Sequence, residues 1–222
     1  MHAQSPIRAV LFDLDGTLLD SYTLIAESFR HACRAVLGRE ISDAEIVADW
    51  GAPLRVRFQR VRGAAPSRVK TLMDAYLAYY GAQHDRLATL FPGVPEMLEA
   101  LKRRGCHMGL VTSKRRYTTR LAVQAFALGR FFDAVVSEQD VPAAKPAPDP
   151  VLKALRDLDA QPHEALMVGD AVFDIQAARA AGVASVAALW GSREIEAVRA
   201  AGPDYEVASP NDVAALIGSG RR

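Results

Sequence analysis

The stretch DLDGTLLD, residues 13–20, directly follows the apolar run IRAVLF, residues 7–12. The apolar run is typical of a buried strand, and two carboxylates stand one residue apart at its end. Residues two apart on an extended chain point the same way, so Asp13 and Asp15 can face one ligand while Leu14 packs behind them. Because a carboxylate at the edge of a core is costly unless it is paired, the stretch predicts a site completed by cations.

Short apolar runs alternate with helical patterns over most of the remaining chain. The further runs expected to be strands are residues 108–111, 134–136, 165–168, 183–189 and, more weakly, 205–207. Strands that alternate with helices in this way predict a parallel sheet with right-handed crossovers. We therefore expect an α/β fold whose core is a Rossmann-like sheet flanked by helices, with strand order 3-2-1-4-5 or the same order with a sixth strand at the edge.

One segment breaks the alternation. Between about Leu18 and Leu87 we expect no strand, only helical stretches at residues 23–37, 43–50, 54–61 and 67–80. The alternating pattern resumes near Leu90. We therefore expect residues 1–17 and 88–222 to form the α/β core, and residues 18–87 to form an inserted, all-helical domain, here called the cap.

The composition is that of an ordinary globular chain. Half of the 222 residues are hydrophobic, 24% are charged and the net charge is +1, so neither a nucleic acid nor a membrane is expected as a partner. No apolar stretch approaches the ~20 residues of a membrane span, and residues 1–6 do not resemble a signal peptide. Cys33 and Cys106 lack metal-type spacing, and we interpret both as reduced thiols in a cytoplasmic protein.

Polar residues follow the apolar runs where a binding site is expected. Sites in an open parallel sheet form beyond the carboxyl ends of its strands. The residues found there are Asp13, Asp15, Thr112, Ser113, Lys145, Asp170 and Asp174. Four carboxylates at one edge repel one another by several kcal/mol at low effective dielectric, so they need cations. Lys145 supplies one positive charge, and Mg²⁺, which prefers oxygen ligands, would supply two, so the set predicts a site for one phosphate and one magnesium ion.

The acidic pair itself indicates phosphoryl transfer. A carboxylate can act as a covalent nucleophile toward a phosphoryl group. If one carboxylate of the pair attacks phosphorus, the other can protonate the leaving oxygen and later activate water. Like charge and partial burial would raise the pKa of one of them, as that second role requires. Gly16 allows the backbone to turn sharply just behind the pair.

Four motifs carry a resemblance to a known family. DLDGT after the first run, VTS at the end of the second, KPAPDP and VGDAVFDI together resemble the motifs of the haloacid-dehalogenase-like hydrolases, in their order. The inserted helical segment resembles that of the branch with a cap after the first strand. The resemblance implies a Mg²⁺-dependent phosphatase that acts on a small phosphorylated metabolite through an aspartyl-phosphate. We expect a monomer or a weak homodimer.

The resemblance also implies a role for each residue at the strand ends. Asp13 would be the nucleophile, and Asp15 would be the general acid/base, with its main-chain carbonyl on Mg²⁺. Asp13 and Asp170 would be side-chain metal ligands, and Asp174 would bind the metal through water or orient the other ligands. Three residues would hold the phosphate and neutralise its charge: Thr112, Ser113 through its amide, and Lys145.

The substrate is expected to depend on the cap. FRHA at residues 29–32 and GAPL at residues 51–54 resemble the phosphoglycolate phosphatase and inorganic pyrophosphatase branches of the family. We expect a phosphoglycolate phosphatase-like activity, with pyrophosphatase activity as the alternative. Of the cap arginines Arg30, Arg34 and Arg55, the last is the best candidate to meet a carboxylate or a second phosphate, because it follows a turn that contains glycine and proline.

Two other interpretations are less favoured. A mutase of the β-phosphoglucomutase kind resembles the chain broadly, but such enzymes commonly carry a β-branched apolar residue where Thr17 stands, and a cap lysine. A receiver-like module, which accepts phosphate without turnover, also carries an acidic pair, a Thr/Ser and a Lys. In receivers the acceptor aspartate ends the third strand, whereas Asp13 and Asp15 follow the first apolar run.

Overall fold

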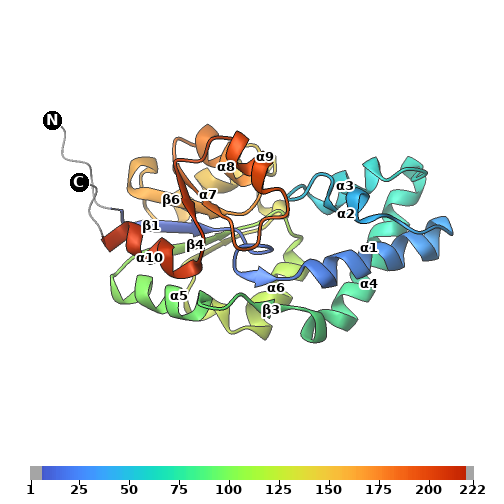
Figure 1. The fold of residues 1–222 in the computed structure, drawn as a ribbon, viewed down its shortest axis with the longest axis horizontal. Coiled ribbons are helices and arrows are strands. Elements are labelled where there is room, and N and C mark those ends of the chain that lie inside the picture. Colours follow the sequence, from blue (N-terminus) through green and yellow to red (C-terminus); the bar gives the residue numbers. More distant parts are fainter. Residues whose placement is uncertain (1–6, 219–222) are drawn as a thin grey trace.

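The computed structural model describes residues 7–218, so the expectation for residues 1–6 lies outside the described part (Figure 1). A six-stranded sheet forms the core, from β1 (Ala9–Phe12), β4 (His107–Val111), β5 (Ala134–Val136), β6 (Ala165–Gly169), β7 (Ala184–Ala188) and β8 (Tyr205–Val207). Its order is β5-β4-β1-β6-β7-β8, and every neighbouring pair is parallel. Numbered among themselves, these strands run 3-2-1-4-5-6, which confirms the Rossmann-like order with a sixth strand at the edge.

Helices cover both faces of the sheet. They are α5 (Val94–Arg103), α6 (Arg116–Ala125), α7 (Asp149–Asp157), α8 (Val172–Ala180), α9 (Ile195–Ala200) and α10 (Pro210–Gly218), with short 3-10 turns at Leu128–Arg130, Glu138–Asp140 and Pro162–Glu164. Alternate residues of β1 pack into different clusters, because side chains alternate across a strand. Ala9 and Leu11 pack with α7 and α8, whereas Val10 and Phe12 pack with α5 and α10. This explains why the first strand is apolar throughout.

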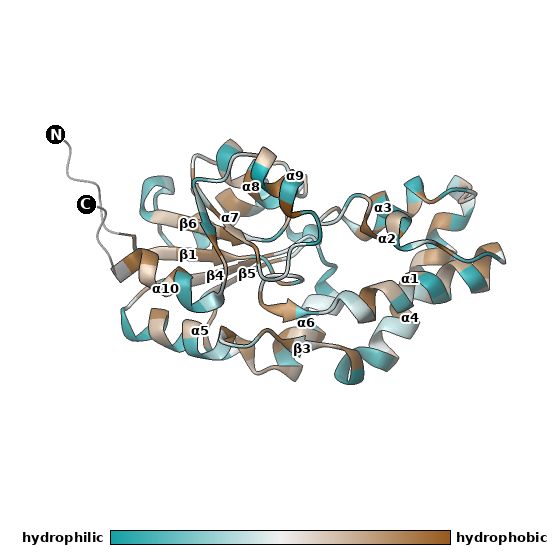
Figure 2. Ribbon diagram, in the orientation of Figure 1, coloured by the Kyte–Doolittle hydropathy of each residue, from teal (hydrophilic) through white to brown (hydrophobic). Residues whose placement is uncertain are grey.

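The helices of the cap lie together at one end of the molecule, away from the sheet (Figure 1). They are α1 (Tyr22–Leu37), α2 (Asp43–Val47), α3 (Leu54–Arg60) and α4 (Val69–Leu87), with a 3-10 turn at Pro66–Arg68. Apolar residues, brown in Figure 2, recur along these helices, and their buried side chains include a small aromatic core. In it, the ring centroids of Phe29 and Phe58 are 4.6 Å apart and those of Phe29 and Tyr76 are 5.1 Å apart.

Two details of the cap differ from the sequence expectation. The prediction of no strand in this segment is wrong at β2 (Leu19–Asp20), which pairs antiparallel with β3 (Thr89–Leu90). A two-residue strand is too short to show a pattern, and its partner is about 70 residues away in the sequence. Helix α2 also ends at Val47 rather than at Trp50, because Ala48 has a ψ of 132° and leaves the helical region.

The exact bounds of core and cap stay a prediction. Among the helices of residues 7–218, none combines the length and the apolarity that a membrane span requires.

Candidate active site

The polar residues expected at the strand ends lie at one edge of the sheet. Phe12, the last residue of β1, is in register with Leu110 of β4 and with Val168 of β6. The residues that follow these strands therefore emerge side by side, with Asp13 after β1, Thr112 after β4 and Asp170 after β6. The backbone N–H of Asp13 donates to the carbonyl of Val168 at 2.9 Å, which continues the sheet pairing to the first carboxylate.

Three buried carboxylates share this edge with one buried lysine. Asp13, Asp170 and Asp174 each offer an oxygen, and these atoms all lie within 4.8 Å of one another. Lys145 donates from Nζ to Asp13 Oδ1 at 2.8 Å, to Asp174 Oδ1 at 2.5 Å and to the Val111 carbonyl at 3.1 Å. One ammonium cannot balance three carboxylates, so the cluster keeps an excess of negative charge when all of them are ionised.

The pKa values of these groups show the same imbalance. Burial raises the pKa of Asp13 to about 6, and the neighbouring Asp174 adds to the effect, although Lys145 opposes it. Burial, together with the charges of Asp13 and Asp174, raises the pKa of Asp170 well above its usual range. Burial lowers the pKa of Lys145, but the two carboxylates it contacts outweigh this and raise it overall. The site is therefore most favourable with a proton or a further cation present.

The donor set fits magnesium. Mg²⁺ takes hard oxygen ligands, and the three carboxylates offer such atoms in a compact, buried group with uncompensated negative charge. Thr17 Oγ1 and Trp50 Nε1 each donate to Asp170 at 3.0 Å, so this candidate ligand is held from both sides. The side chain of Asp15 is not part of the carboxylate group.

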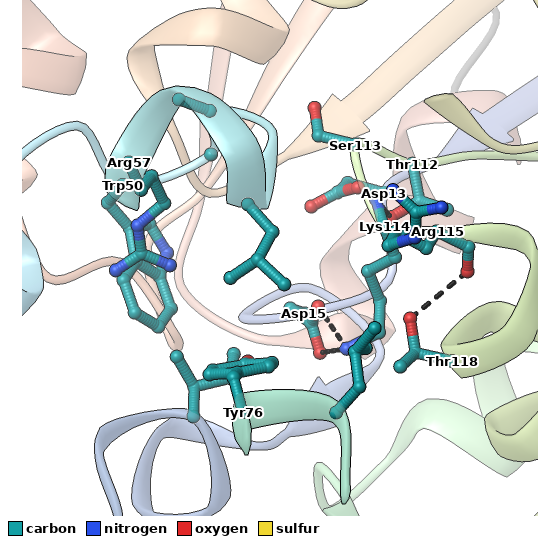
Figure 3. A pocket seen from close by; sticks show the side chains of 15 residues that line it. Asp13, Asp15, Trp50, Arg57, Tyr76, Thr112, Ser113, Lys114, Arg115 and Thr118 are labelled. Atoms are coloured by element: carbon teal, nitrogen blue, oxygen red, sulfur yellow. Dashed lines mark hydrogen bonds and ion pairs between the residues drawn. The ribbon is translucent and has the colours of Figure 1, made fainter. Parts of the chain in front are cut away.

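Asp15 is held by partners that sequence reasoning missed. Lys114 Nζ lies 2.7 Å from Asp15 Oδ2 (Figure 3). Lys114 Nζ also donates to Tyr80 Oη at 2.8 Å, and Ser21 Oγ donates to Asp15 Oδ1 at 2.5 Å. Lys114 stands two residues after Thr112, which follows a predicted strand. That position near a strand end is the sequence signal that could have identified Lys114 as a site residue. Tyr80 belongs to α4, so one lysine of the core contacts both Asp15 and the cap.

A cavity lies between the cap and the sheet edge. Asp13, Asp15, Thr112 and Ser113 line it from the core, and α1, α3, α4 and the turn before α3 line it from the cap (Figure 3). The Ser113 hydroxyl is buried and has no hydrogen-bond partner among the residues described. Hydroxyl groups and a carboxylate that meet in one cavity can hold a phosphate and bring a nucleophile against it.

The cap arginine in this cavity is not the one expected from the sequence. Arg55 is exposed and does not line the cavity, whereas Arg57 does. Both belong to α3, where residues two apart point roughly 200° away from each other, so only one of them can face inward. Arg30 pairs with Glu27 and Asp43 on the surface instead.

Arg57 is unusually placed for an arginine. Its guanidinium lies over the ring of Phe29 at 4.4 Å and over that of Trp50 at 5.3 Å, and one of its amino groups donates to the Ile46 carbonyl. Its Nε is buried and has no hydrogen-bond partner within residues 7–218. Burial lowers its pKa. A buried donor without a partner, beside a cavity, is available to an anionic ligand.

Comparisons of sequence place the chain among known proteins. It matches the model of the haloacid dehalogenase-like hydrolase family over residues 10–188. It is 40% identical over 199 residues to a protein of Caldanaerobacter subterraneus that is provisionally named pyrophosphatase PpaX, and the match covers 90% of this chain and 89% of that relative. It is also 34% identical over 212 residues to pyrophosphatase PpaX of Anoxybacillus flavithermus, with coverage of 96% and 97%.

Solved structures agree on the fold. A Haemophilus somnus protein described as a predicted phosphoglycolate phosphatase has a TM-score of 0.88 and 28% identity, and the match covers 96% of this chain and 98% of that one. A haloacid dehalogenase-like hydrolase from Streptococcus pneumoniae has a TM-score of 0.83 and 30% identity, with coverage of 95% and 98%. With the family model, these full-length matches establish that the chain belongs to the haloacid dehalogenase-like hydrolases.

Proposed function

We propose that the protein is a Mg²⁺-dependent phosphatase that hydrolyses a small phosphorylated metabolite through an aspartyl-phosphate on Asp13. The compact group of Asp13, Asp170 and Asp174 with Lys145 supports this proposal, because the group is buried and its carboxylates outnumber its one positive charge. Asp13 also lines the cavity, so a substrate there could reach it. Bound at these carboxylates, Mg²⁺ would neutralise negative charge on the phosphate and its surroundings. A cytoplasmic location and a monomeric or weakly dimeric state stay predictions from the sequence.

Different residues of the chain bind the phosphate, attack phosphorus and transfer protons. Thr112 and Ser113 bind the phosphate oxygens, and Lys145 holds one oxygen of Asp13 so that the carboxylate is oriented. Asp13 forms a bond to phosphorus while the bond to the leaving oxygen breaks, and Asp15 gives its proton to that oxygen. In the second step Asp15 takes a proton from water, the water oxygen bonds to phosphorus, and Asp13 is released.

Asp15 needs a fixed direction for this task, and its neighbours supply one. Ser21 and Lys114 contact its two carboxylate oxygens, and Lys114 also donates a hydrogen bond to Tyr80 of the cap. The cap forms one wall of the cavity, and its closure over a bound substrate would exclude water and strengthen the electrostatic interactions inside.

The position of Arg57 supports a substrate with a second anionic group. Arg57 lines the same cavity as the proposed nucleophile, and its Nε is buried and has no hydrogen-bond partner within residues 7–218. A substrate with a second anionic group beside its phosphate would satisfy this donor, and an arginine binds a carboxylate well because two parallel N–H groups can reach its oxygens. We therefore propose a phosphoglycolate-like substrate, in which a carboxylate lies close to the phosphate.

Inorganic pyrophosphate is the second candidate. Its second phosphate would meet the same guanidinium, and relatives at 34% and 40% identity carry the name pyrophosphatase PpaX. A mutase is less well supported, because Lys70, the one lysine between residues 18 and 87, pairs with Asp74 on the surface.

A phosphate-release screen tests the proposal. The purified chain is assayed with phosphoglycolate, pyrophosphate, sugar phosphates, nucleotides and p-nitrophenyl phosphate, with Mg²⁺ and with EDTA. We expect Mg²⁺-dependent turnover, highest for one of the first two compounds, and none in Asp13→Asn. Asp15→Asn should still bind Mg²⁺ but turn over slowly. Turnover of p-nitrophenyl phosphate that persists in EDTA, or in Asp13→Asn, would refute the assigned chemistry.

Arg57→Met and Arg55→Met form a matched pair for the substrate class. Loss of a hydrogen bond to a charged group removes about 1.5–3 kcal/mol, so Arg57→Met should lower kcat/KM for the anionic substrate roughly 10- to 100-fold. Its activity on p-nitrophenyl phosphate, which lacks a second anionic group, should change little. Arg55→Met should resemble the wild type on both substrates. Equal losses on both substrates in Arg57→Met would mean that the arginine only stabilises the cap.

A further inference from the structure

The turn between α2 and α3 carries Trp50, a cap residue that contacts the core. Asp49 and Gly51 both have positive φ, at 59° and 89°, and they flank Trp50. Two backbone hydrogen bonds close the turn, from Trp50 N to the Val47 carbonyl at 2.9 Å and from Ala52 N to the Asp49 carbonyl at 3.0 Å. Trp50 is only 5% exposed, although it stands in a turn.

This turn docks directly on the loop that follows β6. The indole Nε1 of Trp50 donates to Asp170 Oδ2 at 3.0 Å, and Asp170 is 1% exposed. A Cβ on Gly51 would stand 2.8 Å from the Cβ of Ala171, so a side chain at that position would push the turn off the loop. A cap residue therefore contacts the side chain of a proposed magnesium ligand, with no room for water between them.

The contact leaves Asp170 able to bind a cation. A carboxylate has about four lone-pair sites. Trp50 takes one of them on Oδ2 and Thr17 takes one on Oδ1 at 3.0 Å, which leaves one on each oxygen. Of these two donors, Thr17 belongs to the core, and its own carbonyl accepts from Trp190 Nε1 at 2.9 Å. Trp50 is the donor that would be withdrawn if the cap moved away.

We propose that Trp50 is a positioning residue that couples docking of the cap to binding of Mg²⁺. With the turn in place, the Asp170 carboxylate has one orientation. Without the turn, the Asp170 carboxylate loses the hydrogen bond from Trp50 and is no longer shielded from water, so it can rotate into solvent. Groups that hydrogen-bond to metal ligands set ligand orientation and metal affinity. Because such coupling is reciprocal, Mg²⁺ favours the docked cap as much as the docked cap favours Mg²⁺. The inference rests on the proposed magnesium site.

The two tryptophans of the chain allow a direct test without turnover. In Trp190→Phe, Trp50 is the single indole. Titration of this variant with Mg²⁺ after EDTA treatment should change the Trp50 emission in a saturable way, with the midpoint equal to the Kd from calorimetry. Asp170→Asn in the same background should abolish that change. An emission that stays constant while calorimetry shows Mg²⁺ binding would overturn the coupling.

Trp50→Phe tests the affinity itself. Removal of a group that orients a metal ligand typically weakens metal binding about 10- to 100-fold, and that loss is expected here by calorimetry. Trp190→Phe, whose indole reaches Asp170 only through Thr17, should weaken Mg²⁺ binding less than Trp50→Phe does. Unchanged affinity in Trp50→Phe would overturn the coupling alone. A wild type that binds no Mg²⁺ would overturn the magnesium site as well. If Trp50→Phe does not fold, the emission titration still decides the question.

Discussion

Replacement of Asp13 by asparagine should abolish turnover and, at the same time, stabilise the metal-free protein. Asp13 is 5% exposed, and burial raises its pKa from 3.8 to about 6 despite the Lys145 contact. The ionised carboxylate is therefore less favourable in the folded chain than in the unfolded one. Asparagine has nearly the shape of the protonated acid and carries no charge, so it removes this penalty while it also removes the proposed nucleophile.

The sign and size of the effect follow from linkage. A carboxyl group whose pKa is raised by folding costs stability as the pH rises from the unfolded value through the folded one. Each pKa unit is worth 1.36 kcal/mol, so a rise from 3.8 to about 6 corresponds to about 3 kcal/mol at pH 7.5. At pH 5 about half of that cost is present. For a chain of this length, 3 kcal/mol raises Tm by roughly 6–12 °C.

Calorimetric unfolding in EDTA at pH 5 and pH 7.5 measures the difference. Asp13→Asn should unfold at a higher temperature than the wild type, and the gap should be larger at pH 7.5. Asp20→Asn, at an exposed position in β2, is the control and should leave Tm unchanged at both pH values. If Asp13→Asn were less stable than the wild type at pH 7.5, the Lys145 ion pair would outweigh desolvation, and the reasoning above would be wrong.

Three further outcomes are expected. Saturating Mg²⁺ should raise the Tm of the wild type more at pH 7.5 than at pH 5. The reason is that protons compete with the cation at Asp13, whose pKa is about 6. An equal rise in Tm at both pH values would count against the magnesium site. Gly16→Ala should lose activity and stability in kinetic and thermal assays, because residue 16 has a φ of 82° and a Cβ there would overlap the Asp170 carboxylate. Cys33 and Cys106 are buried with raised pKa values, so a thiol reagent should label neither until the chain unfolds.

Much of the fold and of the polar cluster could be predicted from the sequence, because both follow from local pattern and chain order. Buried parallel strands are apolar throughout, and the alternation with helices leaves few ways to arrange them. Asp13, Thr112 and Asp170 each follow such a strand, and strands β1, β4 and β6 are neighbours in the sheet. Residues at the ends of neighbouring parallel strands must emerge together, so the predicted residues meet at one edge.

The cap contacts could not be predicted in this way. The choice of Arg57 over Arg55 depends on the rotation of α3 about its own axis, and both arginines follow the same sequence pattern. The pairing of Lys114 with Asp15 joins residues 99 positions apart.

The same holds for Trp50 and Asp170, which are 120 positions apart. Their contact depends on the turn after α2, in which Asp49 and Gly51 have positive φ on either side of Trp50. The order of strands along the chain placed the carboxylates, whereas the docking of one domain on the other placed the groups that orient them, because contacts between the cap and the core leave no periodic pattern in the sequence.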